Sequence, residues 1–183
     1  MSEFESMPKP EIIIPTPEDV ESYRRMQAAA WNDTYPNEAA GVSEAWVKET
    51  TESWLTPDAL ELSRERVAAI LENKNQFLYV AKVKDECVGM VNTTNIDGHQ
   101  RLEALYIDKR YRGTGLAQDL VDQAFSHLDL SQPIILEVIA YNERAQRFYQ
   151  KNGFAVVPGS EHFYKDVMPS LKMIRPGGES HEI

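Results

Sequence analysis

The chain has 183 residues, a formal net charge of −10 at pH 7 and a single cysteine, Cys87. This length fits one domain with a sizeable core, and the negative charge argues against non-specific nucleic-acid binding, which depends on cationic contacts with phosphates. One cysteine excludes an internal disulfide, and we expect Cys87 to lie in the core. The four histidines lack the spacing of a metal site, so we expect no metal.

The acidic surface would attract a cationic substrate, although it also serves solubility alone. No apolar run is long enough to cross a bilayer, and the N-terminus is acidic where a secretory signal would be basic. We therefore expect a cytoplasmic protein that binds neither membrane nor nucleic acid. We expect one domain over residues 11–175, with disorder over 1–10 and 176–183.

The first third of the chain predicts one short strand and three helices. The strand is a run of β-branched isoleucines. Each helix is opened by a Ser or Thr that serves as N-cap, and two of them have a proline at the first helical position. The expected elements are a strand at 12–14 and helices at 17–31, 43–53 and 57–72.

From residue 76 onward the pattern changes to strands separated by turn residues. Three successive strands joined by short polar turns predict an antiparallel meander. A strand-helix-strand crossover then makes its two strands parallel neighbours. The expected strands are 77–83, 87–94, 101–107, 133–139, 154–158 and 167–174, and the expected helices are 115–128 and 142–152.

The most informative stretch is the glycine-containing loop between the strand at 101–107 and the helix that follows. Glycine lets backbone approach a ligand, and a helix start presents unpaired N–H groups and the positive end of the helix dipole. Arg110 and Arg112 add positive charge beside Gly113 and Gly115. The loop therefore predicts a phosphate site, although its spacing matches neither nucleotide fingerprint. The same features also fit a plain surface turn.

The second informative segment is the helix at 142–152. Helical spacing puts Asn142, Ala145 and Tyr149 near one face, where the small alanine leaves room for a slender ligand and the tyrosine offers a phenol. The alternative is an ordinary amphipathic helix in which Phe148 and Tyr149 are core aromatic residues.

Together the two segments resemble the GCN5-related N-acetyltransferase (GNAT) superfamily, over roughly residues 77–174. The family has Arg or Gln, two residues, Gly, one residue, and Gly or Ala at the start of its central helix, as at Arg110, Gly113 and Gly115. Its second motif is matched by Asn142, Ala145, Phe148, Tyr149, Gly153 and Phe154. The first third of the chain looks like a subgroup of bacterial single-domain members, some similar to polyamine acetyltransferases.

The resemblance implies an α+β fold whose mixed, mostly antiparallel sheet has splayed parallel central strands and flanking helices. It also implies an enzyme that moves the acetyl group of acetyl-CoA directly to a primary amine, either of a small molecule such as a polyamine or of a peptide. The alternative is a module of the same fold that binds or senses CoA without efficient turnover. Dimers are common in the family, but nothing in the sequence fixes an interface.

In the family, the loop holds the pyrophosphate of acetyl-CoA and the pantetheine arm lies along the strand before the loop. A backbone N–H of that strand would also stabilise the oxyanion formed on attack. The implied cofactor-binding residues are Leu105, Tyr106, Ile107, Arg110, Arg112, Gly113, Thr114, Gly115, Leu116, Ala117, Asn142, Ala145 and Phe148.

Two residues are candidates for proton transfer. Tyr149 stands at the family's position for the general acid that protonates the leaving thiolate. Glu103 is a possible base, since an alkylamine with a pKa of about 10 must lose a proton before it attacks. The alternative for Glu103 is a salt bridge with Arg101 on the sheet face.

For the acceptor, the region between Trp31 and Trp54 is the expected wall. Trp31 and Tyr35, with Glu38 and Glu44, are candidates to hold a cation. The same residues fit equally well as core and surface residues.

Overall fold

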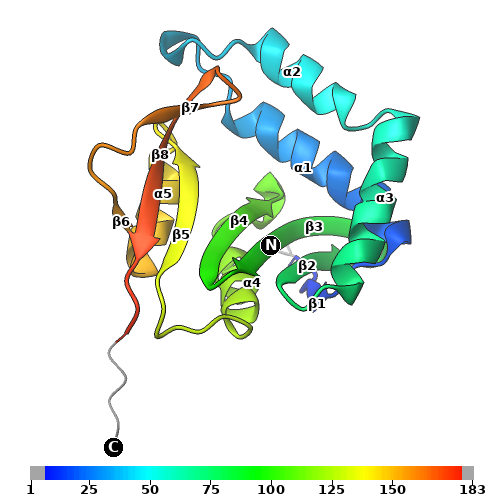
Figure 1. The fold of residues 1–183 in the computed structure, drawn as a ribbon. Helices are drawn as coiled ribbons and strands as arrows, with labels where there is room; N and C mark the ends of the chain where they lie inside the picture. The colour runs from blue at the N-terminus through cyan, green and yellow to red at the C-terminus, as the bar shows by residue number, and fades with distance from the viewer. Residues whose placement is uncertain (1–6, 179–183) are drawn as a thin grey trace, which may run out of the picture.

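In the computed structural model, which describes residues 7–178, one mixed sheet forms the centre of the molecule (Figure 1). Its strand order is β1-β2-β3-β4-β5-β8-β6, and β7 also pairs with β8. Only β4 and β5 are parallel neighbours. The strands are β1 (Glu11–Ile13), β2 (Gln76–Val83), β3 (Glu86–Ile96), β4 (His99–Ile107), β5 (Ile134–Ile139), β6 (Ala155–Val156), β7 (His162–Tyr164) and β8 (Met168–Arg175).

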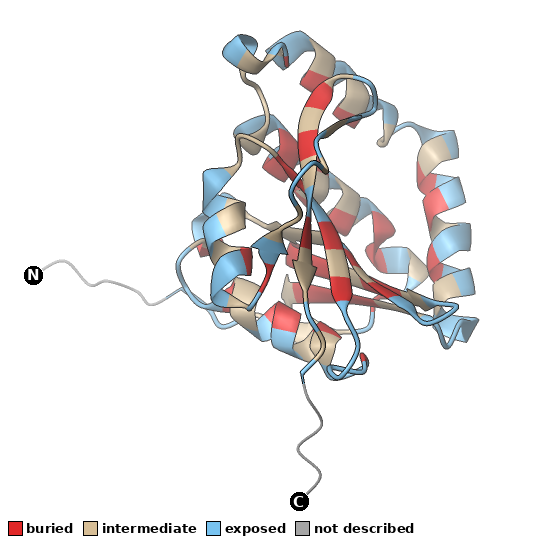
Figure 2. Cartoon of the chain, turned by 60° about the vertical axis from the view of Figure 1, so that its left-hand side comes forward, coloured by how far each residue is buried: buried red, intermediate tan, exposed pale blue. Residues whose placement is uncertain are grey.

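Helices cover both faces of this sheet. On one face, α1 and α3 pack on β2 and β3 around a core that includes Val20 and Val67; on the other, α4 and α5 enclose a second core that includes Leu120 and Leu136. Figure 2 shows buried residues concentrated on the strands and on the inner sides of the helices. The helices are α1 (Val20–Thr34), α2 (Glu44–Ser53), α3 (Pro57–Glu72), α4 (Leu116–Phe125) and α5 (Glu143–Lys151).

The α+β fold expected from the resemblance is confirmed, including the parallel central pair. The main differences are that α1 continues through residues 32–34 and that β7 was not predicted. The extension of α1 is stabilised by Asn32, whose Nδ2 donates to Ala28 O and Thr51 Oγ1. Cys87 lies in the core, as expected.

The expected domain limits stay a prediction. Regular structure extends from Glu11 to Arg175, within the expected domain. Of the two ends expected to be disordered, residues 1–6 and 179–183 lie outside the described part of the chain. No helix within residues 7–178 is both long and apolar enough to cross a membrane.

A β-bulge in β4 positions the functional region. Asn92 pairs with Ala104 and the next residue, Thr93, pairs with Leu102, so Glu103 is an extra residue without a partner on β3. The bulge explains why Leu102 and Leu105, three positions apart, both pack in the α4 core. Bulges re-aim side chains, and they concentrate next to active sites.

The parallel pairing of β4 with β5 ends beside this bulge. It comprises three residue pairs, the last of which is Leu102 with Leu136. Beyond Leu102, the edge of β4 that faces β5 has no strand partner, and Figure 1 shows the two strands diverging. The splayed strands implied by the resemblance are therefore present, and they leave backbone groups of β4 available to a ligand.

One ion pair makes a testable contribution to stability. Asp19 is 8% exposed, and its carboxylate accepts from Lys82 Nζ at 2.5 Å and from Thr16 N at 2.9 Å. Burial raises the pKa of Asp19, but these hydrogen bonds and the Lys82 charge outweigh it and hold the pKa below its ordinary value. We expect Asp19→Ala to lower the free energy of unfolding by about 3 kcal/mol in urea denaturation, because it leaves the partly buried Lys82 unpaired.

The lowered pKa of Asp19 also predicts how the stability contributed by this ion pair changes with pH. A carboxyl whose folded-state pKa is lowered stabilises the fold above its unfolded pKa of about 3.9, and the contribution is lost as pH falls through the folded value. Wild type and Asp19→Ala should therefore approach equal stability in strong acid. Glu21→Ala, which removes an exposed helix pair with Arg25, is the control and should cost no more than about 0.5 kcal/mol. Equal losses in the two variants at neutral pH would contradict the prediction.

Candidate active site

The glycine loop, the splayed part of β4 and the start of α5 enclose a cavity of about 310 Å³, which we call the first cavity. The end of α1 forms another part of its wall, through Ala30, Thr34 and Tyr35. The structure thus brings together two sequence motifs that lie about thirty residues apart in the chain. The predicted cofactor residues that line this cavity are Leu105, Tyr106, Ile107, Arg112, Gly113, Gly115, Ala117, Asn142, Ala145 and Phe148.

The loop has the conformation of an anion site. Gly113 and Gly115 have φ values of +79° and +95°, in the left-handed region that favours glycine. A Cβ on either residue would meet no protein atom within 4 Å, so these glycines are required by backbone conformation and not by crowding within the protein. Within the described chain, the N–H groups of Gly113, Gly115, Leu116 and Ala117 have no hydrogen-bond acceptor. They lie at the start of α4, where the helix dipole favours an anion.

Three predicted residues do not line the first cavity. The Arg110 guanidinium, expected to add positive charge beside the loop, pairs with Asp108 at 2.7 Å and with Glu86. Thr114 Oγ1 donates to Tyr111 O at 2.7 Å, and Leu116 is buried in the α4 core. These side chains shape the loop. Their role in cofactor binding stays a prediction.

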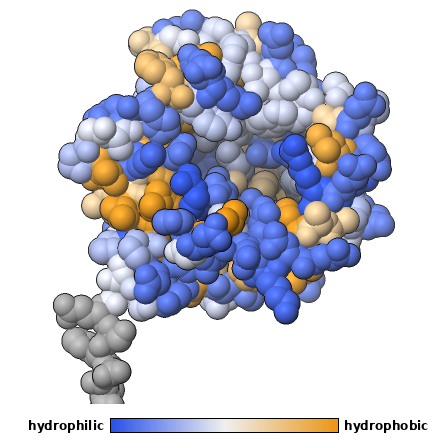
Figure 3. All heavy atoms as spheres, viewed as in Figure 1, coloured by the Kyte–Doolittle hydropathy of each residue, from blue (hydrophilic) through white to orange (hydrophobic). Residues whose placement is uncertain are grey.

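A second cavity, of about 250 Å³, opens between β4 and β5 on the side of α1 and β7. It shares Tyr35, Leu105, Tyr106, Asn142, Ala145 and Tyr149 with the first cavity, so the two meet at these residues. Figure 3, drawn from the side of Figure 1, shows the surface hollowed at its centre. Two molecules that enter the two cavities would therefore meet at Tyr149.

Tyr149 lies both in the core and at the walls of the two cavities. Its ring packs in the α4 core, 5.9 Å from the Phe154 ring, while its residue lines both cavities. Burial, and then Tyr106 nearby, raise the pKa of Tyr149. Burial also raises the pKa values of Tyr35 and Tyr106, so these three phenols keep their protons at neutral pH.

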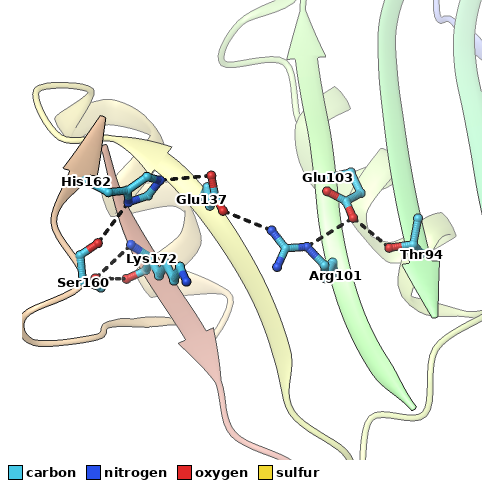
Figure 4. Close-up of polar contacts among 7 residues, drawn as sticks. All are labelled: Thr94, Arg101, Glu103, Glu137, Ser160, His162 and Lys172. Carbon is cyan, nitrogen blue, oxygen red and sulfur yellow. Dashed lines mark hydrogen bonds and ion pairs between the residues drawn. The ribbon is translucent and has the colours of Figure 1, made fainter. Parts of the chain in front are cut away.

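A charged network crosses the opening between β4 and β5 at the second cavity (Figure 4). Arg101 Nε lies 3.2 Å from Glu103 Oε1, and Arg101 Nη2 lies 3.2 Å from Glu137 Oε1. The salt bridge considered for Glu103 is therefore present. The network continues to His162, whose Nε2 lies 3.2 Å from Glu137 Oε2.

The two carboxylates of this network, Glu103 and Glu137, differ in whether one oxygen is left without a partner. Both partners of Glu103, the Thr94 hydroxyl that donates to it at 2.8 Å and the Arg101 guanidinium in the ion pair, contact Oε1. Glu103 Oε2 therefore has no partner among residues 7–178, whereas both oxygens of Glu137 are occupied. A carboxylate oxygen without a partner, at the wall of a cavity, can accept a proton directly or through water.

The predicted acceptor residues divide into two groups. Trp31 and Tyr35 line the second cavity, where the Trp31 ring contacts Tyr35 edge to face at 4.9 Å. Trp31 is 4% exposed and its Nε1 has no hydrogen-bond partner in the described structure, which leaves one buried donor at this wall. Glu38 and Glu44 are exposed and lie outside both cavity linings, as their surface interpretation requires.

Two charged residues of these cavities were missed. Arg144 lines the first cavity and precedes Ala145 within the second motif, so its place in the first turn of the helix was a usable signal. Glu137 lines the second cavity, but nothing in an apolar strand sequence shows where that strand leaves its neighbour. Within residues 7–178, no group of three or more His, Cys, Asp or Glu side chains is placed to hold a metal ion.

Solved structures share the fold of this chain. PaiA N-acetyltransferase from Thermoplasma acidophilum, in complex with coenzyme A, is 19% identical, with a TM-score of 0.71 over 90% of this chain and 98% of that one. A GNAT-family acetyltransferase from Streptococcus pneumoniae is 20% identical, with a TM-score of 0.70 over 93% and 100%. Ard1 from Thermoplasma volcanium is 21% identical, with a TM-score of 0.61 over 94% and 100%. A search of curated proteins gives no match.

The family comparison covers most of the chain. The model described as "Acetyltransferase (GNAT) domain" matches residues 32–175, which include the glycine loop, both splayed strands and α5. The chain therefore belongs to the GNAT family of acetyltransferases.

Proposed function

We propose that this chain transfers an acetyl group from acetyl-CoA directly to a primary amine. The observation that carries the proposal is the meeting of two cavities at Tyr149, beside the unpaired edge of β4. One cavity ends at a loop suited to phosphate, and the other has aromatic and carboxylate walls suited to an amine. The coenzyme A in the PaiA structure, which has the same fold, supports this choice of cofactor.

The first cavity fits acetyl-CoA in three respects. The free N–H groups of Gly113, Gly115, Leu116 and Ala117 suit the pyrophosphate. The unpaired edge of β4 offers backbone hydrogen bonds to the amides of the pantetheine arm. Ala145, which lines both cavities, leaves room for that narrow arm where it reaches Tyr149.

The proposed reaction needs no covalent enzyme intermediate. The amine nitrogen attacks the thioester carbon, a tetrahedral intermediate forms, and the carbon–sulfur bond then breaks. The nitrogen of the neutral amine gives up one proton to Glu103 Oε2, directly or through water, and the departing sulfur takes a proton from Tyr149. Exchange with solvent then removes the proton from Glu103 and restores the one on Tyr149. The products are an amide and the free thiol of CoA. Trp31 and Tyr35 would form the wall against which the acceptor lies.

The difference between the carboxylates of Glu103 and Glu137 allows a matched test of Glu103 as the general base. We expect Glu103→Gln to lower turnover at neutral pH on the order of 10²-fold, because it removes the only free carboxylate oxygen seen at this network. Glu137→Gln is the matched control: it also changes a partner of Arg101, but it should lower turnover less than about threefold. Steady-state kinetics with saturating acetyl-CoA measure both. Equal losses of turnover in the two variants would show that the whole network has only a structural role.

Two measurements test the function itself. Isothermal titration calorimetry should detect acetyl-CoA binding, and no heat at millimolar cofactor would overturn the proposal. A thiol-release assay with a diamine, an amino acid and a lysine-containing peptide should then show turnover with at least one acceptor. Binding without thiol release from any amine is the result expected of the alternative, a CoA-sensing module. Location in the cytoplasm and assembly into a dimer stay predictions.

A further inference from the structure

Positive charge gathers at one side of the first cavity. Arg112 and Arg144 both line it, from the glycine loop and from α5. Lys109 lies beside them, with its Nζ 4.0 Å from Asp33 Oδ1. Two cations, Arg112 and Lys109, thus pair with the single carboxylate of Asp33, and Arg144 adds a third positive charge at the same cavity, in a chain whose overall charge is −10. This local excess of positive charge favours an anionic ligand.

Arg112 is held in place by the end of α1. Its Nη1 lies 2.5 Å from Asp33 Oδ2, and its Nη2 donates to Thr34 Oγ1 at 3.2 Å. Two of its nitrogens thereby connect the loop to the helix that also supplies Tyr35 to both cavities. Asp33 therefore fixes the direction of Arg112, which is also a residue of the cavity wall.

Arg144 has no such partner. It forms no ion pair within residues 7–178, and the adjacent carboxylate, Glu143, is bonded to Arg147 at 3.0 Å. Burial, and then the positive charge of Arg112, lower the pKa of Arg144, whereas Asp33 raises it. Since both residues line the first cavity, one ligand there can contact Arg112 and Arg144 together.

Acetyl-CoA carries two separate anionic groups, the pyrophosphate and a phosphate monoester on the ribose. The N–H groups of the glycine loop suit the pyrophosphate. A monoester has about two negative charges and three exposed oxygens, and planar guanidiniums bind such a group through paired hydrogen bonds. The unpaired Arg144 and the oriented Arg112 provide this chemistry at the same cavity.

We propose that Arg112 and Arg144 form a subsite for the ribose phosphate monoester of the cofactor, with Asp33 as the residue that positions Arg112. The subsite rests on the proposed function, because it assumes that acetyl-CoA occupies the first cavity. It adds Arg144, which was not among the residues predicted from the sequence, to the positive charge expected from Arg112. It also connects the cofactor loop to α1, which forms part of the acceptor wall.

Calorimetry with acetyl-CoA and with acetyl-dephospho-CoA, which lacks only this phosphate, tests the subsite. Wild type should bind acetyl-CoA at least about tenfold more tightly than acetyl-dephospho-CoA. Arg144→Gln should reduce this preference to within about twofold, mainly by weakening acetyl-CoA binding. Arg147→Gln is the matched control on the same helix, because Arg147 is exposed, bonds Glu143 and lies outside the cavity; its preference should equal that of wild type.

The possible outcomes separate the two proposals. If wild type binds neither ligand, the proposed function fails. If wild type binds both equally, or if Arg144→Gln keeps the full preference, the subsite is overturned while the proposed function stands. Asp33→Ala should also weaken acetyl-CoA binding and reduce the preference, because Arg112 is no longer held; tighter binding in this variant would show that Asp33 only competes for Arg112 and would overturn its positioning role.

Discussion

Replacing Tyr149 with Phe is expected to lower kcat on the order of 10³-fold and to change the dissociation constant of acetyl-CoA less than about twofold. The ring supports the core beside Phe154, and Phe keeps that packing. What the variant loses is the hydroxyl at the junction of the two cavities. The thiolate of CoA would then leave without a proton donor.

The raised pKa of Tyr149 predicts how pH affects this step. Burial and the neighbouring Tyr106 favour the neutral phenol, so the acid stays protonated up to and beyond its ordinary pKa of about 10. The wild-type rate should rise with pH as more of the amine loses its proton, without a falling limb from Tyr149 below about pH 10. A falling limb in that range that disappears in Tyr149→Phe would show an ordinary or lowered pKa and contradict the prediction.

Tyr79→Phe is the matched control for loss of a buried hydroxyl. Tyr79 is 7% exposed, and its hydroxyl bonds His127 Nε2 at 2.5 Å, outside both cavities. This variant should lose some stability and keep kcat. An unchanged rate in Tyr149→Phe, or an equal loss in Tyr79→Phe, would remove Tyr149 as the general acid.

The elements whose limits or pairing follow from local sequence signals could be predicted. A proline after the N-cap Thr56 set the start of α3, and its predicted range, 57–72, is the observed one. The crossover rule made β4 and β5 parallel. By contrast, β7 has three residues and depends on its pairing with β8, so no periodic pattern distinguishes it from a loop.

The site residues that one sequence motif places together could be predicted. The direction of side chains that depends on tertiary contacts could not. The glycine loop and the face of α5 lie at the first cavity because their spacing fixes their local conformation. The direction of a long side chain depends on partners distant in sequence. Arg110 pairs with Asp108, which is near in sequence, but it also contacts Glu86. Arg112 contacts Asp33, and neither Glu86 nor Asp33 is near enough in the chain for spacing to reveal it. The bulge at Glu103 likewise arises from pairing with β3.

Filling the part that the two cavities share at Ala145 should abolish function without unfolding the protein. Ala145 lines both cavities, and we expect Ala145→Phe to weaken acetyl-CoA binding on the order of 10³-fold, because the added ring takes the space proposed for the pantetheine arm. The melting temperature should change by only a few degrees, since Ala145 is only partly buried and borders both cavities, and the Asn142 cap bonds the backbone N–H of residue 145. Calorimetry and a thermal melt measure the two effects.

Ala155→Phe makes the same substitution at an exposed position of β6 outside both cavities, so it separates blockage from a general effect of an added aromatic ring. This control should bind acetyl-CoA as wild type does. If Ala145→Phe keeps wild-type affinity and a cooperative melt, the pantetheine arm does not pass Ala145, and the cofactor must approach Tyr149 by another route. If it loses both affinity and cooperative melting, a smaller change, Ala145→Val, provides the test, because it narrows the cavity with less strain and should still weaken binding.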